Sequence, residues 1–226
     1  MSSPLVPSRA PSHEHLDESD TPSAEVLRSL RDLRNINRWL GGHRAYRRLL
    51  AALLPSHPVV IADIGTGTSD NLESLDQRQA SRLVGLDFKL HHLLFGRQLA
   101  SRPVDRIASN ALALPLRSSS VDIVTSAHFF HHFSEDENVR ILEEALRVAR
   151  IGVAVTDTRR HLAPLLFVRA VAATPLWGRI TREDAPASVL QGYTPGEAAG
   201  IAARTTARRW KVVHQIPFRF GLLLWK

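Results

Sequence analysis

A short apolar run that ends in an acid and a glycine turn constrains this chain more than any other feature. Residues 59–64, Val-Val-Ile-Ala-Asp-Ile, precede Gly65 and Gly67, and a segment compatible with a helix follows. A continuous apolar run of this length is typical of a strand buried on both faces of a parallel sheet. Glycine accepts positive φ and lets a ligand approach the backbone closely. The stretch therefore predicts a strand leading into a nucleotide-binding loop, with Asp63 at the carboxyl edge of the sheet, where ligands bind.

Strand and helix patterns continue to alternate along the chain and predict a doubly wound α/β fold with a parallel sheet. After the first strand, the expected strands are 82–88, 106–108, 121–126 and 151–157. We expect a helix over 71–80, directly after the glycine loop. Two β-rich runs, 210–216 and 218–225, close the chain and are split by Pro217. They predict an antiparallel hairpin at the edge of the sheet.

Length and composition fit one domain behind an N-terminal tail. The chain has 226 residues, of which 44% are hydrophobic, as is ordinary for a globular protein. Residues 1–22 are rich in Ser, Pro, His and acids without periodicity, which predicts a disordered tail. A single domain over 23–226 would begin with helices in 23–54. We expect residues 161–192, an apolar helix followed by a polar loop, to form a substrate lid, with a simple cover for the sheet as the alternative.

Cysteine content and charge exclude or disfavour several kinds of function. The absence of cysteine excludes disulfides, thiolate metal sites and cysteine nucleophiles, and we expect no metal site. The apolar runs are too short for a membrane span and the N-terminus lacks a signal-peptide pattern, so we expect a cytoplasmic protein. The formal net charge is +7. The 29 basic residues are scattered along the chain, and only three of them are lysines. This leaves nucleic acid open as a partner but disfavoured.

Three kinds of ligand compete for the glycine loop. A dinucleotide fingerprint needs a third glycine where Asp70 stands, and a phosphate-binding P-loop needs a lysine that this loop lacks. An adenosyl ligand without a pyrophosphate needs only the glycine turn and an acid for the ribose hydroxyls. Asp87 lies 20 residues after Gly67, the spacing of a ribose-binding acid, and Phe88 beside it could pack on adenine. The adenosyl ligand is therefore favoured.

Four motifs in order resemble class I S-adenosylmethionine (SAM)-dependent methyltransferases. They are Asp63-x-Gly65-x-Gly67, Gly85-Leu86-Asp87, Asn110-Ala111-x-x-Leu114-Pro115-Leu116-x5-Asp122-Ile123-Val124 and His131-His132-Phe133. The resemblance covers residues 55–157. It implies a Rossmann-like, mostly parallel seven-stranded sheet with an antiparallel C-terminal hairpin, and SAM as the cofactor.

The resemblance also implies a cofactor site. Its residues would be Asp63, Gly65, Thr66, Gly67, Asp87, Phe88, Asn110, Ala111, Ser126, Ala127 and His128. Asp63, Gly65 and Gly67 would line the methionine moiety and Asp87 would hold the ribose, while Asn110 and Ala111 would lie at the adenine edge. The last three would close the pocket floor. Ser69 and Asn110 depart from the usual Gly and Asp, and Asn110 still offers an acceptor to the adenine amino group.

Methyl transfer from a sulfonium depends on alignment more than on acid–base catalysis. A base helps only when the acceptor must lose a proton, as a phenol or an acid does. His131 and His132, and secondarily His128, follow the fourth strand and are candidate bases, because neutral imidazole suits that role near pH 7. Histidines at this place are also common in the family without being catalytic.

The methyl acceptor is predicted from the side chains around these histidines. Phe129, Phe130, Phe133 and the apolar segment 161–177 favour a small, aromatic or hydrophobic molecule and O-methylation. The absence of cysteine argues against pyrimidine C5 methylation, which uses a thiolate nucleophile. The alternatives are an RNA methyltransferase that uses the basic surface and a non-catalytic SAM-binding partner subunit.

Overall fold

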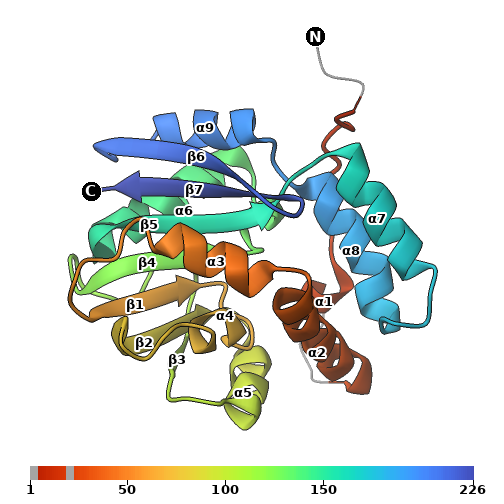
Figure 1. The fold of residues 1–226 in the computed structure, drawn as a ribbon, viewed down its shortest axis with the longest axis horizontal. Coiled ribbons are helices and arrows are strands. Elements are labelled where there is room, and N and C mark those ends of the chain that lie inside the picture. The colour runs from red at the N-terminus through yellow and green to blue at the C-terminus, as the bar shows by residue number, and fades with distance from the viewer. Residues whose placement is uncertain (1–4, 19–22) are drawn as a thin grey trace.

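Seven strands form one sheet in the order β3-β2-β1-β4-β5-β7-β6 (Figure 1). The structure is a computed structural model and describes residues 5–18 and 23–226. The strands are β1 (Val59–Ile64), β2 (Ala80–Asp87), β3 (Asp105–Ala108), β4 (Val121–Ala127), β5 (Ala149–Thr158), β6 (Arg209–Gln215) and β7 (Arg219–Trp225). Strands β1 to β5 pair in parallel, and β7 is antiparallel to both β5 and β6. The predicted Rossmann-like fold with an antiparallel C-terminal hairpin is therefore confirmed.

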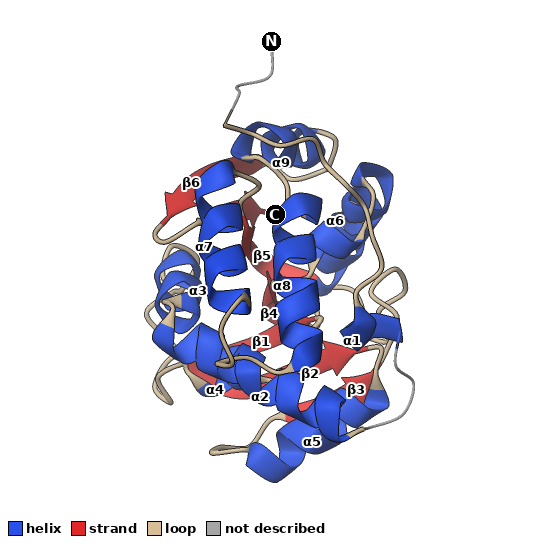
Figure 2. Ribbon diagram, turned by 90° about the vertical axis from the view of Figure 1, so that its right-hand side faces the viewer, coloured by secondary structure: helices blue, strands red, loops and turns tan. Residues whose placement is uncertain are grey.

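Helices cover both faces of the sheet and its carboxyl edge. They are α1 (His15–Glu18), α2 (Ala24–Trp39), α3 (Gly42–Leu50), α4 (Asp70–Glu73), α5 (Leu90–Leu99), α6 (Glu135–Val148), α7 (Leu162–Ala172), α8 (Arg179–Gln191) and α9 (Pro195–Ala203). Helices α6 and α9 pack on one face and α3 on the other. Helices α1, α2, α7 and α8 lie at the edge where the parallel strands end (Figures 1 and 2). No helix in the described part of the chain is long and apolar enough to cross a membrane.

The alternation of side chains along the central strands explains the two packed faces. Ile61 and Ile123 belong to the apolar cluster that includes α3, whereas their neighbours Ala62 and Val124 belong to the cluster that includes α6. Successive residues of a strand point to opposite faces, so a strand covered on both sides must be apolar throughout.

Capping residues set several helix boundaries. Ser23 accepts a hydrogen bond from Val26 N at the start of α2. Ser134 and Thr194 each form a capping box at the start of α6 and α9. Such caps satisfy backbone N–H groups that have no partner inside the helix.

Two predicted elements differ from the structure. The expected helix over 71–80 is the single turn α4, since Asp76 accepts a hydrogen bond from Arg78 N at 2.9 Å and turns the chain into β2. The expected polar loop after residue 177 is helix α8. Its buried face includes Thr181, Asp184 and Gln191, so a hydrophobic pattern could not reveal it.

The N-terminal tail is the third difference. Residues 1–4 and 19–22 of the predicted tail lie outside the described residues, but 5–18 contact α8 and the 3-10 turn Phe130–His132. Ala10 N donates to Leu190 O at 3.2 Å, and the Arg9 guanidinium donates to Phe133 O at 2.9 Å. These contacts are polar, so they leave no hydrophobic periodicity in the sequence.

Candidate active site

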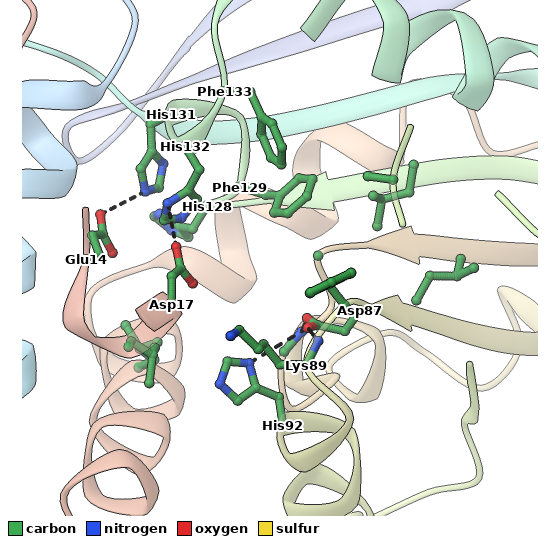
Figure 3. A pocket seen from close by; sticks show the side chains of 18 of the residues that line it. Glu14, Asp17, Asp87, Lys89, His92, His128, Phe129, His131, His132 and Phe133 are labelled. Atoms are coloured by element: carbon green, nitrogen blue, oxygen red, sulfur yellow. Dashed lines mark hydrogen bonds and ion pairs between the residues drawn. The ribbon is translucent and has the colours of Figure 1, made fainter. Parts of the chain in front are cut away.

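A cavity of about 540 Å³ lies at the carboxyl edge of the sheet, between the strand ends and the helices that cover them (Figure 3). Of the predicted cofactor residues, those that line it are Gly65, Gly67, Asp87, Phe88, Asn110, Ala111 and His128. The remaining four, Asp63, Thr66, Ser126 and Ala127, are buried and do not line the cavity. Figure 3 shows Asp87, Lys89 and His92 at one end of the cavity, and His128, His131 and His132 with Glu14 and Asp17 at the other.

Asp87 joins the second strand to the glycine loop. Its Oδ2 accepts a hydrogen bond from Gly67 N at 2.7 Å, and its Oδ1 accepts one from Lys89 N at 2.8 Å. Burial raises the pKa of the Asp87 carboxyl to about 6. Each carboxylate oxygen has two acceptor positions, so both oxygens can still accept a hydrogen bond from a ligand hydroxyl.

The two glycines of the loop serve different purposes. Gly67 has φ +52°, and a Cβ at this position would meet no atom within 4 Å, so its backbone lies open to a ligand. Gly65 has φ +66°, and a Cβ there would lie 2.3 Å from Cδ2 of Phe129. The first glycine therefore lets an aromatic side chain pack on the loop, and the second leaves space in the cavity.

Asp63 contacts the neighbouring strand β4 through its carboxyl group. Its Oδ1 accepts a hydrogen bond from Thr125 Oγ1 at 2.6 Å, and Tyr46 Oη lies 2.7 Å from the same hydroxyl. Burial raises the pKa of Asp63 to about 6. This carboxyl sits at the end of β1, as predicted, but contacts the neighbouring strand instead of the cavity.

Two polar groups beside Asp87 were missed by sequence reasoning. His92 Nε2 and Ser109 Oγ are buried, line the cavity and have no hydrogen-bond partner among the described residues. Burial lowers the pKa of His92 to about 4, so its ring is neutral. Unpaired buried polar atoms are costly, and their presence next to the Asp87 carboxyl fits a site for a polar ligand. His92 lies on α5, and no motif marks it in the sequence.

His131 is held between two acids. Its Nδ1 lies 2.8 Å from Asp157 Oδ1, and its Nε2 lies 3.5 Å from Glu14 Oε1. Burial favours the neutral ring, but the attraction of Asp157 and Glu14 outweighs it and raises the pKa of His131 to about 10. At neutral pH the ring is an imidazolium with no lone pair, so this environment opposes the predicted role of His131 as a base.

His128 is neutral and fully engaged. Its Nε2 accepts a hydrogen bond from Arg219 Nε at 3.1 Å, and its Nδ1 lies 3.3 Å from Thr158 Oγ1. Burial and the adjacent Arg219 guanidinium lower the pKa of His128 to about 3. Since the lone pair already faces the guanidinium, this ring is poorly placed to accept a proton from an acceptor.

His132 differs from both neighbours. Its Nδ1 lies 2.9 Å from Asp17 Oδ2, and its side chain lines the cavity with 21% of its surface exposed. Its Nε2 has no hydrogen-bond or ion-pair partner within the described ranges. Among the three predicted bases, His132 is the one whose second ring nitrogen remains available.

One cluster could supply ligands to a metal ion. Glu14, His131 and His132 each offer a ligand atom, and these atoms lie within 4.8 Å of one another. Glu14 Oε1 already accepts hydrogen bonds from Ser188 Oγ at 2.6 Å and Gln191 Nε2 at 3.1 Å. Because His131 is also paired with Asp157, two of the three residues, Glu14 and His131, already have hydrogen-bond or ion-pair partners outside a metal site.

Comparison with known proteins agrees with this geometry. Residues 62–155 match a family model described as a methyltransferase domain. A SAM-dependent methyltransferase from Aquifex aeolicus is similar in structure, with a TM-score of 0.63 and 20% identity over 87% of this chain and 96% of that one. Human N-acetylserotonin methyltransferase in complex with SAM gives a TM-score of 0.66 and 14% identity over 88% and 55% of the two chains.

A third similar structure is the plantazolicin methyltransferase BpumL in complex with a triazolic desmethylPZN analog and SAH. Its TM-score is 0.66 at 13% identity, over 89% of this chain and 96% of that one. At these identities the likeness shows a shared fold. No curated protein sequence gives a significant match to this chain.

Proposed function

Because the chain is a class I SAM-dependent methyltransferase, we propose that it methylates a small aromatic or hydrophobic acceptor, with oxygen as the favoured target. The observation that carries this proposal is the shape of the single cavity described above. It joins the glycine loop and Asp87 to a chamber beside Phe129, Phe133 and His132. Its volume of about 540 Å³ is in the range of small-molecule sites.

The residues at the end of the cavity that contains the glycine loop and Asp87 fit the adenosyl cofactor. Asp87 would accept hydrogen bonds from the ribose hydroxyls, and the open backbone at Gly67 would lie against the methionine moiety. Asn110 and Ala111 would border the adenine, with His92 and Ser109 offering further polar contacts. When bound, SAM supplies an electrophilic methyl group on a sulfonium.

The end of the cavity beside Phe129, Phe133 and His132 fits an apolar acceptor that must lose a proton. Leu30, Leu33 and Ile36 of α2 line the same cavity as Phe129 and Phe133, which flank the 3-10 turn η1 (Phe130–His132). His132 would accept the proton of a phenol or acid through Nε2, while the walls exclude water and align the acceptor. His131 and His128 would hold the geometry of this end without exchanging protons.

The arrangement of arginines supports a small acceptor over RNA. Arg34 and Arg106 both pair with Glu73, at 3.1 and 3.2 Å. Arg160 pairs with Glu197, and Arg147 with Glu144. These four arginines are therefore paired with acids of the same chain, which weakens their attraction to a phosphate backbone.

A direct assay tests the proposal. The purified chain would be incubated with SAM carrying a tritiated methyl group and with 2-naphthol, catechol, benzoic acid or bulk transfer RNA. We expect label in at least one of the small acceptors and none in the RNA. Label in RNA alone would favour the nucleic-acid alternative. Tight SAM binding without transfer to any acceptor would favour a non-catalytic subunit.

A further inference from the structure

We infer that Asp17 is the positioning residue for His132, and that the N-terminal segment (residues 5–18) completes the acceptor end of the cavity by delivering it. The inference rests on the proposed function, because it assigns a partner to the proposed proton acceptor. Its central observation is that a carboxylate distant in sequence meets the one histidine of the three whose Nε2 is unengaged among the described residues.

The contact between Asp17 and His132 has the geometry of an orienting pair. Asp17 Oδ2 lies 2.9 Å from His132 Nδ1, and both side chains line the cavity (Figure 3). A carboxylate can only accept at this nitrogen, so it stabilises the tautomer with the proton on Nδ1 and the lone pair on Nε2. It also stabilises the imidazolium that forms when Nε2 takes a proton, as in other carboxylate–histidine pairs.

The segment that carries Asp17 is anchored at a second acid. Glu14 is 7% exposed and is tied to His131, Ser188 and Gln191. The backbone N–H groups of His15 and Leu16 donate to the Asp184 carboxylate at 3.0 and 3.1 Å. These contacts fix the turn of chain directly before Asp17 against α8.

Burial separates the roles of the two acids. Glu14 is buried within a network, whereas the Asp17 side chain is 48% exposed at the rim of the cavity. An exposed ion pair contributes little to folding stability. Asp17 is therefore expected to matter for the orientation of His132 and much less for holding the fold.

The segment also restricts access to the chamber. Arg9 reaches the carbonyl oxygens of His131 and Phe133 at 3.1 and 2.9 Å, and its guanidinium lies 4.3 Å from the Tyr193 ring centroid. The segment thus contacts the histidine turn at both Arg9 and Asp17. An acceptor larger than the chamber would have to displace this segment and, with it, the partner of His132.

The test compares Asp17→Asn with Glu18→Gln, a matched change on the next residue. The Glu18 side chain is exposed, and within residues 5–18 and 23–226 its one ion pair is with His15 at 3.8 Å. With 2-naphthol as the probe acceptor, we expect Asp17→Asn to lower kcat about tenfold or more, while KM for SAM and the urea midpoint stay unchanged. Glu18→Gln should behave as wild type. A normal kcat in Asp17→Asn would overturn the inference.

A double variant separates positioning from a merely structural role. If Asp17 acts only through His132, then adding Asp17→Asn to His132→Gln should cause no further loss of kcat, because the two effects are not additive. A further loss of the same size as in the wild-type background would contradict the inference. So would activity that EDTA abolishes and Zn²⁺ restores, since the histidines would then act as metal ligands.

A second readout needs no acceptor and so distinguishes failure of the inference from failure of the proposed function. Nitrogen NMR of histidine-labelled protein with S-adenosylhomocysteine should show His132 mainly as the Nδ1–H tautomer in wild type and as a mixture in Asp17→Asn. An unchanged tautomer ratio would overturn the inference even if methyl transfer is found. The expected ratios together with no transfer would overturn only the proposed function.

Discussion

Three histidines within five residues of sequence have three different electrostatic environments. His128 faces a guanidinium, His131 faces two carboxylates, and His132 faces one carboxylate at the rim of the cavity. The partners come from β7, β5 and the N-terminal segment, which are remote in the chain. The sequence could place all three histidines at the end of β4, but could not rank them as bases.

The variant His131→Gln should destabilise the fold more than it affects chemistry. It removes the cation between buried Asp157 and Glu14 and leaves their charges unpaired, a change that costs about 3 to 5 kcal/mol for a buried pair. Urea unfolding should show this loss. His132→Gln should instead retain the urea midpoint and lower kcat about 100-fold, near the lower end of what a positioned base contributes. The opposite pattern would exchange the roles of the two histidines.

Cofactor affinity should depend on pH through Asp87. Burial raises the pKa of this carboxyl to about 6, and its ionised form is the better acceptor for ribose hydroxyls. SAM affinity should therefore fall at most about tenfold per pH unit below pH 6 and level off above it. Calorimetry between pH 5 and 8 measures this.

Asp63, whose pKa is also raised to about 6, makes a control necessary. The variant Asp87→Asn should bind SAM weakly and with little pH dependence. If its affinity kept the wild-type pH profile, the titration would belong to Asp63 or to another group. Wild-type affinity in Asp87→Ala would remove Asp87 from the cofactor site altogether.

At the scale of single elements, the glycine loop depends on one contact that the sequence does not reveal. Positive φ at Gly65 and Gly67 follows from the motif, but the packing of Phe129 on Gly65 joins this loop to the end of β4. Phe129 thus forms part of the cavity wall from a segment 64 residues away in sequence.

Gly65→Ala should therefore be more damaging than Gly67→Ala. Both place a Cβ on a residue with positive φ, which costs about 1 to 2 kcal/mol. Only at Gly65 would the new carbon lie 2.3 Å from an aromatic ring. Thermal unfolding should show the larger loss for Gly65→Ala, and adding Phe129→Ala should recover part of it. Equal losses in the two single variants would mean that Phe129 moves aside freely.

Whether the other helices and strands could be predicted from the sequence depends on which interactions stabilise them. Strands that are buried on both faces, such as β1, were predicted from the local sequence pattern. Helix α8 and the N-terminal segment were not, because buried Asp184 and Glu14 hold them through hydrogen bonds. From the sequence alone, a polar residue is predicted to be exposed unless its hydrogen-bond partner is known. Seven of the eleven predicted cofactor residues line the cavity, whereas the lining residues Glu14, Asp17 and His92 were missed.

Across the whole molecule, the carboxyl edge of the sheet concentrates buried charge. Asp157 lies near the end of β5 beside His131. Arg219 of the neighbouring strand β7 donates a hydrogen bond to His128. Glu14 from the N-terminal segment and Arg160 with Glu197 extend the network towards α8 and α9. The edge that binds ligands is thus held by ion pairs, and the interior of the sheet by apolar packing.

This distribution should make folding stability depend on pH in a defined window. The pKa of His131 is raised from 6.5 to about 10 in the folded state by Asp157 and Glu14, although burial opposes this. Its stabilisation is complete below pH 6.5 and is lost as the pH rises towards 10, because the folded protein keeps a proton that the unfolded chain releases. The free energy of unfolding should fall by about 1.4 kcal/mol per pH unit in this window.

Urea titrations at pH 7, 8 and 9 measure this slope, and His131→Gln supplies the control. The variant should be less stable than wild type at pH 7, and its stability should change little between pH 7 and 9, so the two curves should converge as the pH rises. If the stability curves of wild type and variant were parallel, a group other than His131 would be responsible for the pH dependence. Because Glu14 contributes to the raised pKa of His131, deletion of residues 1–18 should reduce the slope as well. That result would show that the N-terminal segment is part of the folded edge in solution.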